Sequence, residues 1–312
     1  MNSRDVKVAA CESQLFTSAL EWIYRELPTE TRTAQVEVAS RELAPENIVV
    51  ATVCDRLLGA MPFQCGAGGV GWVWPPNLSG LTQELKEAIE IGSRLVEAAV
   101  HRLARDGCRL VQALVSVGAE PGRVLEASGF VRITEVICMR RDCDREPVSA
   151  FGVPPLAFVP YSPELREVFA RVVQRTYVGT LDCPELDGLR SIDDVLAGYR
   201  ASGVFRPDLW LLARDGSENL GCVLLCHWPE EKRCELQYMG LVPEARGRRL
   251  GTALGLRAIQ TAHEVGAAEL CLAVDVRNYL ATTMYRSLGF DEMDRRSVFI
   301  LPLRTAGPPC ED

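Results

Sequence analysis

The feature that most constrains the fold of this chain is an order of strands and helices that its two halves share. In the second half, the strands predicted from DLWLLAR, NLGCVLLCHW and RCELQYMGLVP precede a long helix, the strand ELCLAVDV, a short helix and the strand RRSVFILPL. The first half gives the same order, with NIVVATVC, RLLGAMPFQC and GVGWVWPP before a long helix, RLVQALV, a short helix and RITEVICMR. These patterns predict two α/β copies of one plan.

Glycines and turn residues mark the limits of the two copies. Gly107 and Gly266 each close the long helical pattern of their copy, and the segments ASGF and SLGF close the short one. Between the copies, the segment DCDREPVSAFGVPPLAF replaces the periodic pattern with proline, glycine and charge. We therefore predict one domain over 1–147 and a second over 148–312. The alternative interpretation is that the halves look alike because α/β halves in general do.

The composition excludes several classes of protein. A chain of 312 residues with 47% hydrophobic residues and a net charge of -8 is typical of a globular protein, and its acidity argues against nucleic acid as a partner. No run approaches the roughly 18 apolar residues of a membrane span, and MNSRDVKVAACESQ lacks a secretory pattern. Most of the 12 cysteines lie in apolar segments, as buried free thiols do. We predict a cytoplasmic protein without a membrane partner; the oligomeric state stays open.

The segment PEARGRRLGTALGLRAI, at Pro243–Ile259, places three arginines and two glycines ahead of a long helix. The start of a helix has unpaired N–H groups and partial positive charge, so it attracts anions and disfavours arginine unless an anion is bound. Phosphate loops of the GxxxxGK[ST] and GxGxxG types are absent from the chain. A solvated helix start is the alternative. The predicted anion site comprises Arg246, Gly247, Arg248, Arg249, Leu250, Gly251 and Thr252.

This segment resembles the coenzyme A pyrophosphate loop of the GNAT superfamily of acyl-CoA-dependent N-acyltransferases, whose pattern is [QR]-x-x-G-x-[GA], with Arg249 in place of the more common glycine. The segment VRNYLATTMYRSLGF resembles the later motif of the superfamily. The tandem arrangement resembles two-copy members of the mycothiol synthase type, in plan only. The resemblance implies an α/β fold of two tandem GNAT-like domains, each a central mixed, largely antiparallel sheet flanked by helices.

The resemblance also implies a reaction and roles for single residues. The chain would move an acetyl group from acetyl-CoA, its co-substrate, to a primary amine, with a small molecule as the first expectation and no metal. The strand YMGLV would splay from its neighbour and offer backbone groups, Leu241 and Val242 among them, to pantetheine. Asn278 would bond the pantetheine or the acceptor, Tyr285 would protonate the departing thiolate, and Glu235 would be the base.

Each of these roles has a structural alternative. Tyr285 could be a core aromatic, Asn278 a helix cap, and Glu235 a solvated carboxylate at the end of a strand. Asp275 alternates with apolar residues, so we interpret it as an ordinary strand position.

The sequence gives weaker indications of an acceptor site and of a metal site. The segment TYVGTLDCPELDGLRSIDD would offer an acidic approach to a cationic amine through Asp182, Glu185 and Asp187, or is simply a solvated loop. In CVLLCH, the two cysteines lie on one face of a strand and His227 on the other, which does not favour a metal site.

The first copy differs from the second at the predicted site. Aligning Gly92 with Gly251 puts Glu87 and its neighbours opposite the arginines, and acids there would repel a pyrophosphate. Aligning Gly129 with Gly289 likewise puts Leu125 opposite Tyr285. We predict that 1–147 is a degenerate GNAT-like domain without a coenzyme site, and that 148–312 is a GNAT domain with an acetyl-CoA site.

Two other functions stay open at this point. One is a non-catalytic coenzyme A-binding regulator or interaction scaffold with a vestigial site, and a weaker one is a nucleotide-binding module of another fold. The sequence leaves undecided whether the donor carries an acetyl or a longer acyl group.

Overall fold

The computed structural model describes residues 6–76, 84–145 and 151–303, and its contacts divide the chain into two units. Unit 1 comprises Met1–Ile133 and Ser297–Asp312, and unit 2 comprises Thr134–Arg296. Each unit thus holds part of the last strand of the other half of the chain. The boundary predicted between 147 and 148 falls outside the described residues, and that division stays a prediction.

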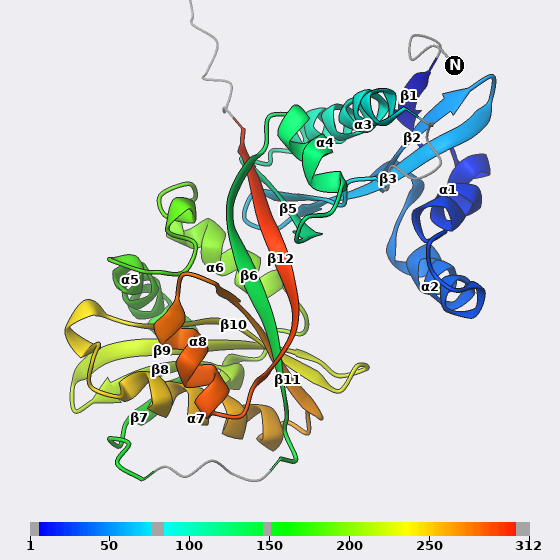
Figure 1. Cartoon of the computed structure of the whole chain (residues 1–312). Coiled ribbons are helices and arrows are strands. Elements are labelled where there is room, and N and C mark those ends of the chain that lie inside the picture. The colour runs from blue at the N-terminus through cyan, green and yellow to red at the C-terminus, as the bar shows by residue number, and fades with distance from the viewer. Residues whose placement is uncertain (1–5, 77–83, 146–150, 304–312) are drawn as a thin grey trace, which may run out of the picture. The chain divides into compact units, whose positions relative to one another are not determined.

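Unit 1 contains a sheet with helices packed against it (Figure 1). The strands, in spatial order, are β1 (Lys7–Ala10), β2 (Ile48–Val53), β3 (Arg56–Gly66), β4 (Val70–Val73), β5 (Leu110–Ser116) and the unit 1 part of β12 (Asp291–Pro302). The helices are α1 (Phe16–Ile23), α2 (Thr29–Glu42), α3 (Leu85–Arg105) and α4 (Pro121–Ala127). Strands β1 to β4 pair antiparallel, while β4 and β5 are parallel.

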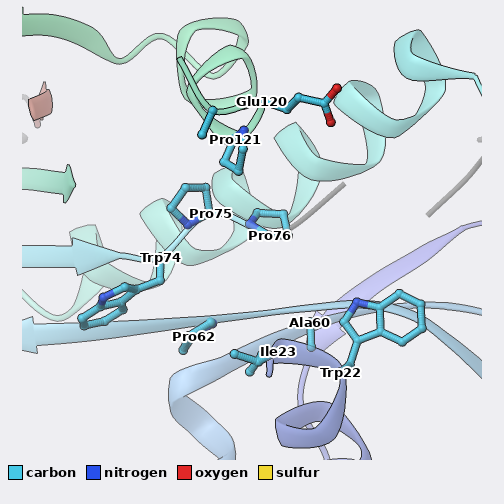
Figure 2. A pocket seen from close by; sticks show the side chains of 10 residues that line it. Trp22, Ile23, Ala60, Pro62, Trp74, Pro75, Pro76, Glu120 and Pro121 are labelled. Atoms are coloured by element: carbon cyan, nitrogen blue, oxygen red, sulfur yellow. The ribbon is translucent and has the colours of Figure 1, made fainter. Parts of the chain in front are cut away.

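A cavity of about 470 Å³ opens in unit 1 beside the end of β4 (Figure 2). Figure 2 shows Pro75, Pro76 and Pro121 on one side of it and Pro62 and Ile23 on the other. Among the described residues, its lining includes no arginine or lysine.

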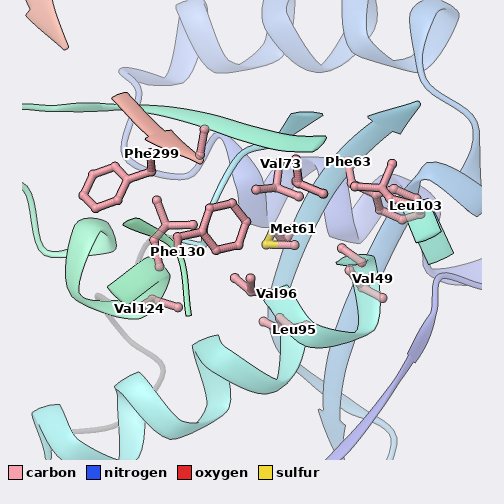
Figure 3. Close-up of a cluster of buried hydrophobic side chains, with 14 of the residues drawn as sticks. Val49, Met61, Phe63, Val73, Leu95, Val96, Leu103, Val124, Phe130 and Phe299 are labelled. Atoms are coloured by element: carbon pink, nitrogen blue, oxygen red, sulfur yellow. The ribbon is translucent and has the colours of Figure 1, made fainter. Parts of the chain in front are cut away.

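The core of unit 1 lies between α3 and the sheet (Figure 3). Ile91, Leu95, Ala99 and Leu103 follow the helical period, and all four are fully buried. Val49, Met61, Phe63, Val111 and Phe299 belong to the same cluster. Phe299 comes from β12, so the last strand of the chain helps to close the core of unit 1.

Unit 2 has a sheet with helices on both faces (Figure 1). Its strands, in spatial order, are β7 (Ala157–Pro160), β8 (Trp210–Asp215), β9 (Glu218–Trp228), β10 (Arg233–Leu241), β11 (Glu269–Asp275) and the unit 2 part of β6 (Val131–Asp142). The helices are α5 (Arg166–Tyr177), α6 (Ile192–Ala201), α7 (Leu250–Glu264) and α8 (Tyr279–Ser287).

Alternation along the strands of unit 2 builds two cores. Trp210 and Leu212 of β8 pack with Phe169 of α5, while Leu211 and Ala213 face the cluster that holds residues of α7 and α8. Only β10 and β11 pair parallel among the described pairs of this unit. The predicted class, α/β with mixed, largely antiparallel sheets flanked by helices, is confirmed.

The parallel pair in unit 2 separates along its length. β10 pairs with β11 only over Arg233–Leu236, whereas its pairing with β9 continues to Leu241. A bulge lies between Leu236 and Tyr238. The predicted splay of YMGLV is therefore confirmed, and it leaves one edge of β10 without a strand partner. In the described part of the chain, no helix is both long and apolar enough to cross a membrane.

Candidate active site

The splay between β10 and β11 opens into a cavity of about 420 Å³ in unit 2. Its walls come from the end of α5 and the following loop, from β10 and β11, and from the first turns of α7 and α8. Most of the residues predicted from the sequence line it: Leu241, Arg246, Gly247, Arg249, Leu250, Gly251, Thr252, Asn278 and Tyr285. Glu235, Val242 and Arg248 are not among the lining residues.

The loop between β10 and α7 has the shape that an anion site requires. Gly247 and Arg249 have positive φ angles of 74° and 61°, which turn the chain into the start of α7. Among the described residues, the N–H groups of Gly247, Arg248 and Arg249 have no backbone partner. Together with the first N–H groups of α7, they concentrate backbone donors at the start of this helix. Arg249 adopts this left-handed conformation at a cost of roughly 1 kcal/mol, which a glycine avoids.

The three arginines of the loop have different surroundings. Arg246 donates to the carbonyls of Thr176 at 2.8 Å, Gly179 at 3.1 Å and Leu241 at 3.2 Å. Its guanidinium thereby ties the loop to the end of α5. Arg248 lies 3.7 Å from Asp215 with its side chain half exposed.

Arg249 lines the cavity, and no ion pair or hydrogen bond joins its side chain to the described residues. The freest positive charge of the loop is therefore at Arg249, and Arg246 fixes the shape of the loop.

Two predicted residues have packing roles. Val242 is 2% exposed, clusters with Leu220 and Leu250, and donates its N–H to the carbonyl of Leu220 at 2.9 Å. It lies beneath the loop. A Cβ on Gly251 would lie 3.2 Å from the sulfur of Met284, so this glycine also allows α8 to approach α7.

The exposed edge of β10 carries an unsatisfied acceptor. Gln237 lies at the bulge and lines the cavity, and its Oε1 is buried without a hydrogen-bond partner among the described residues. A buried acceptor of this kind is costly unless a donor reaches it. An amide N–H, such as pantetheine carries, fits this need.

Gly240 makes room on the same strand. A Cβ there would lie 2.7 Å from Cβ of Thr176, so the glycine allows α5 to pack closely on β10. The hydroxyls of Thr176 and Tyr238 are 2.6 Å apart and hold this contact in place.

Tyr285 and Asn278 come from α8. Tyr285 is 7% exposed, packs edge-on against Phe290 and lines the cavity. Burial, and to a smaller extent the charge of Asp182, raises the pKa of Tyr285, so its hydroxyl stays protonated and can donate. Asn278 caps α8 by accepting the N–H of Ala281 at 3.3 Å, and it also lines the cavity. The cap that the sequence offered as an alternative is present, and a role toward ligand stays a prediction.

Glu235 lies in the part of β10 that pairs with β11. Leu236 lines the cavity, and strand alternation directs the neighbouring Glu235 side chain to the opposite face of the sheet. Burial raises the pKa of Glu235, and the charge of Arg233 opposes part of that rise. Its role as a base stays a prediction.

Asp275, interpreted from the sequence as an ordinary strand position, is at the centre of a buried hydrogen-bond network. This carboxylate is fully buried and accepts hydrogen bonds from the Thr134 hydroxyl at 2.8 Å, the N–H of Cys183 at 3.0 Å and the Arg277 guanidinium at 2.7 Å. Burial alone would raise the pKa of Asp275, but the bonds from Arg277, Cys183 and Thr134 hold it below its ordinary value. Arg277 also forks onto Glu185, at 2.6 and 2.8 Å.

Asp182 completes this network at the cavity wall. Its Oδ1 accepts the backbone N–H of Asp275 at 2.8 Å, and the side chain lines the cavity together with Tyr285. Burial, and then the charge of Asp275, raises the pKa of Asp182. Of the acidic approach considered from the sequence, Asp182 lies at the cavity, Glu185 is paired with Arg277, and Asp187 is exposed and does not line the cavity.

Among the described residues, this network also contains a group of side chains close enough together to bind a metal ion. Asp182, Cys183 and Asp275 offer atoms within 4.8 Å of one another. Both oxygens of Asp275, however, already accept hydrogen bonds, some of them from a cation. The prediction of no metal stays a prediction.

The first copy differs in the start of its long helix. α3 begins at Leu85, so Glu87 lies within the helix and Gly92 well inside it, whereas α7 begins one residue before Gly251. The additional turns of α3 occupy the sequence that forms the loop in the second copy. Leu125, opposite Tyr285 in the alignment, is fully buried. A first domain without a coenzyme site remains a prediction that these features support.

Comparison with known proteins gives one family model and a set of relatives. Residues 180–290 match the model of the Acetyltransferase (GNAT) family. Mycothiol acetyltransferase of Actinosynnema mirum is 30% identical over 227 residues, which cover 64% of this chain and 72% of the relative. That of Saccharopolyspora erythraea is 27% identical over 241 residues, covering 68% and 77%. A shorter match to the Renibacterium salmoninarum protein, 35% identical over 71 residues, spans 23% of this chain and 21% of the relative.

Solved structures share the fold over nearly the whole chain. A GCN5-related N-acetyltransferase from Sphaerobacter thermophilus has a TM-score of 0.65 and 15% identity, covering 96% of each chain. A tandem GNAT protein from the clavulanic acid biosynthesis pathway has a TM-score of 0.52 and 16% identity, covering 97% of this chain and 99% of that one. The predicted fold of tandem GNAT-like domains is confirmed.

Proposed function

The chain belongs to the acetyltransferase (GNAT) family, and from this premise we propose that unit 2 transfers an acetyl group from acetyl-CoA to a primary amine of a small molecule. The observation that carries the proposal is the cavity at the splay of β10 and β11, which has a donor-rich loop and Arg249 in its wall together with a buried tyrosine. A non-catalytic coenzyme A-binding role is not favoured, because the relatives are named as acetyltransferases.

Acetyl-CoA, the co-substrate of GNAT acetyltransferases, supplies an activated thioester. In our proposal, the loop N–H groups and Arg249 bind its phosphates. The open edge of β10 and the Gln237 side chain bind its pantetheine amides. Arg246 positions the loop through the three carbonyls it holds.

Proton transfer requires an acid and a base on the cavity wall. Tyr285 supplies a protonated hydroxyl for the leaving thiolate. An amine attacks only when neutral, so a carboxylate must remove its proton. Glu235 is the base expected from the sequence, and Asp182 is the carboxylate that lines the cavity with Tyr285. We propose that Asp182 has this role, because of the two carboxylates it is the one that lines the cavity, and its raised pKa suits proton transfer near neutral pH.

The names of the relatives suggest which acceptor amine to test first. They are named mycothiol acetyltransferase, so we propose a mycothiol-related amine as the first acceptor to test. For the first half of the chain we propose a structural role without a coenzyme site.

The deciding experiment is isothermal titration of the full chain with acetyl-CoA and, separately, with ADP. One site per chain for acetyl-CoA, weakened in an Arg249→Glu variant, would support the proposal. A release of free thiol in the presence of a panel of primary amines, including mycothiol lacking its acetyl group, would then identify the acceptor. Failure to bind acetyl-CoA, or an equal response to ADP, would refute the proposed function.

A further inference from the structure

Two cysteine thiols outside the acetyl-transfer site face each other in unit 1. Cys65, in β3, is exposed, and Cys108, between α3 and β5, is buried. Their sulfur atoms are 3.1 Å apart. No other pair of thiols is in contact among the described cysteines. Most of the cysteines were expected to be buried free thiols, and an exposed thiol touching a buried one is a different arrangement.

The backbone holds the two cysteines together independently of their side chains. Gly69, in the turn after β3, accepts the N–H groups of Arg109 at 2.7 Å and Leu110 at 3.3 Å. Cys108 itself donates to the carbonyl of Leu103 at 3.0 Å, which fixes it to the end of α3. The β3–β4 hairpin and the turn between α3 and β5 are thus joined by backbone hydrogen bonds near the point where the thiols meet.

The two thiols differ in reactivity. Burial, and then the neighbouring Cys65 thiol, raises the pKa of Cys108, so Cys108 is the poorer nucleophile toward a reagent in solution. Cys65 is accessible and reacts first. Once Cys65 carries a leaving group, the adjacent Cys108 sulfur attacks at short range, where proximity compensates for its low thiolate fraction.

We propose that Cys65 and Cys108 are a redox modification site that a low-molecular-weight disulfide converts reversibly to an intramolecular disulfide. In the first step, Cys65 attacks the small disulfide, forms a mixed disulfide and releases one small thiol. In the second, Cys108 attacks the sulfur of Cys65 and releases the second small thiol. The two cysteines lose two electrons and two protons, and the small disulfide gains both.

The new bond would join β3 to the turn before β5 and close the chain between them. A cross-link over a segment of this length stabilises a protein largely by restricting its unfolded state. Oxidation is therefore expected to raise the midpoint of thermal unfolding by several degrees, and dithiothreitol reverses it.

The test treats the reduced full chain with oxidised glutathione and maps its peptides without reduction. We expect one linked pair containing Cys65 and Cys108, lighter by two hydrogens than the separate peptides and separated by dithiothreitol. Exposed Cys54 serves as the internal control, because it should retain glutathione as an adduct.

Two variants separate the steps. Cys65→Ser should abolish the link and the rise in the unfolding midpoint, while Cys108→Ser should leave glutathione attached to Cys65. Cys54→Ser should leave the link unchanged. The peptide map of the wild-type chain decides the matter even if a variant misfolds. Cys65 that keeps glutathione, or that stays reduced while Cys54 reacts, would overturn the proposal.

Discussion

The carboxylate of Asp182 accepts the backbone N–H of Asp275 across 2.8 Å, although the two residues belong to a loop after α5 and to the end of β11. This bond holds a loop carboxylate on the wall of the cavity that Tyr285 also lines. The cavity thus brings together a carboxylate and a phenol that can exchange protons with a substrate.

Asp182→Asn should reduce kcat by about 100-fold or more, the usual effect of losing a general base, and should change acetyl-CoA affinity little. Glu235→Gln is the matched comparison, because Glu235 is not among the residues that line the cavity. Steady-state kinetics with the acceptor found in the amine panel would measure both. A larger loss for Glu235→Gln would identify Glu235 as the base instead.

The pH profile gives an independent check on Asp182. Because its pKa is raised, the base becomes protonated at a higher pH than an ordinary aspartate would. The pH at which kcat falls on the acidic side should therefore lie above the ordinary aspartate pKa of about 3.9. This acidic limb should disappear in Asp182→Asn. An unchanged limb in the variant would assign it to another group.

Tyr285→Phe should lower kcat by about 100-fold while acetyl-CoA affinity stays within about twofold, because the variant removes only the protonated hydroxyl. Tyr279→Phe is the control, since Tyr279 opens the same helix and is 65% exposed. Kinetics combined with titration of acetyl-CoA separates the two effects. A fall in affinity at unchanged kcat would make Tyr285 a packing residue.

Arg249→Gly should have opposite effects on stability and on binding. The glycine relieves the left-handed strain and should add roughly 1 kcal/mol to the free energy of unfolding. Loss of the charge should weaken acetyl-CoA binding about tenfold, near the lower range for a charge-assisted bond.

The control for this variant is Lys232→Gly, which also removes a positive charge at a left-handed position, with φ of 49°, but lies outside the cavity lining. It should stabilise the protein without changing the affinity. Urea unfolding and titration measure the two quantities. If Arg249→Gly binds acetyl-CoA as tightly as the wild type, Arg249 does not bind the phosphates.

Arg246→Met should lower both stability and coenzyme affinity, because three carbonyls lose their donor and the loop loses its attachment to α5. Arg248→Met should affect stability little, since its contact with Asp215 is long and exposed. Thermal unfolding with and without acetyl-CoA distinguishes these outcomes. Equal stability of the two variants would contradict a positioning role for Arg246.

Arg277→Met should destabilise the protein by about 2 kcal/mol, since it leaves the buried Asp275 carboxylate without its ionic partner. Arg166→Met is the control, because its pair with Asp193 is exposed and should be worth about 0.5 kcal/mol or less.

The same ion pair should make stability depend on pH. Because the pKa of Asp275 is lowered in the folded protein, its stabilisation is present at neutral pH and is lost as the pH falls through that folded pKa. Urea unfolding should therefore show that the wild type and Arg277→Met differ in free energy of unfolding at neutral pH, and that this difference becomes smaller at acidic pH.

Local patterns in the sequence predicted much of the fold and most of the residues that line the cavity of unit 2. The repeated order of strands and helices predicted the class, because the periods of two and 3.6 residues are local properties. Arginine and glycine before Leu250 predicted the loop, because a helix start and its positive φ angles depend on neighbouring residues.

Contacts between distant segments were not predictable in the same way. Asp275 looked like an ordinary strand residue because two of its partners, Thr134 and Cys183, lie far from it in the sequence. The sequence does not show that Arg246 donates to the carbonyls of Thr176, Gly179 and Leu241, because Thr176 and Gly179 lie about 70 residues earlier in the chain.

The sequence by itself indicated two α/β halves and, in the second half, a strand followed by a glycine- and arginine-rich loop at the start of a helix. Tertiary structure alone decided that β6 lies beside β11 and the end of β12 lies in unit 1, because alternation specifies which face of a strand is buried but not which strand is its neighbour. It also decided which carboxylate lines the cavity, because the position of Asp182 depends on a hydrogen bond to a strand formed much later in the chain.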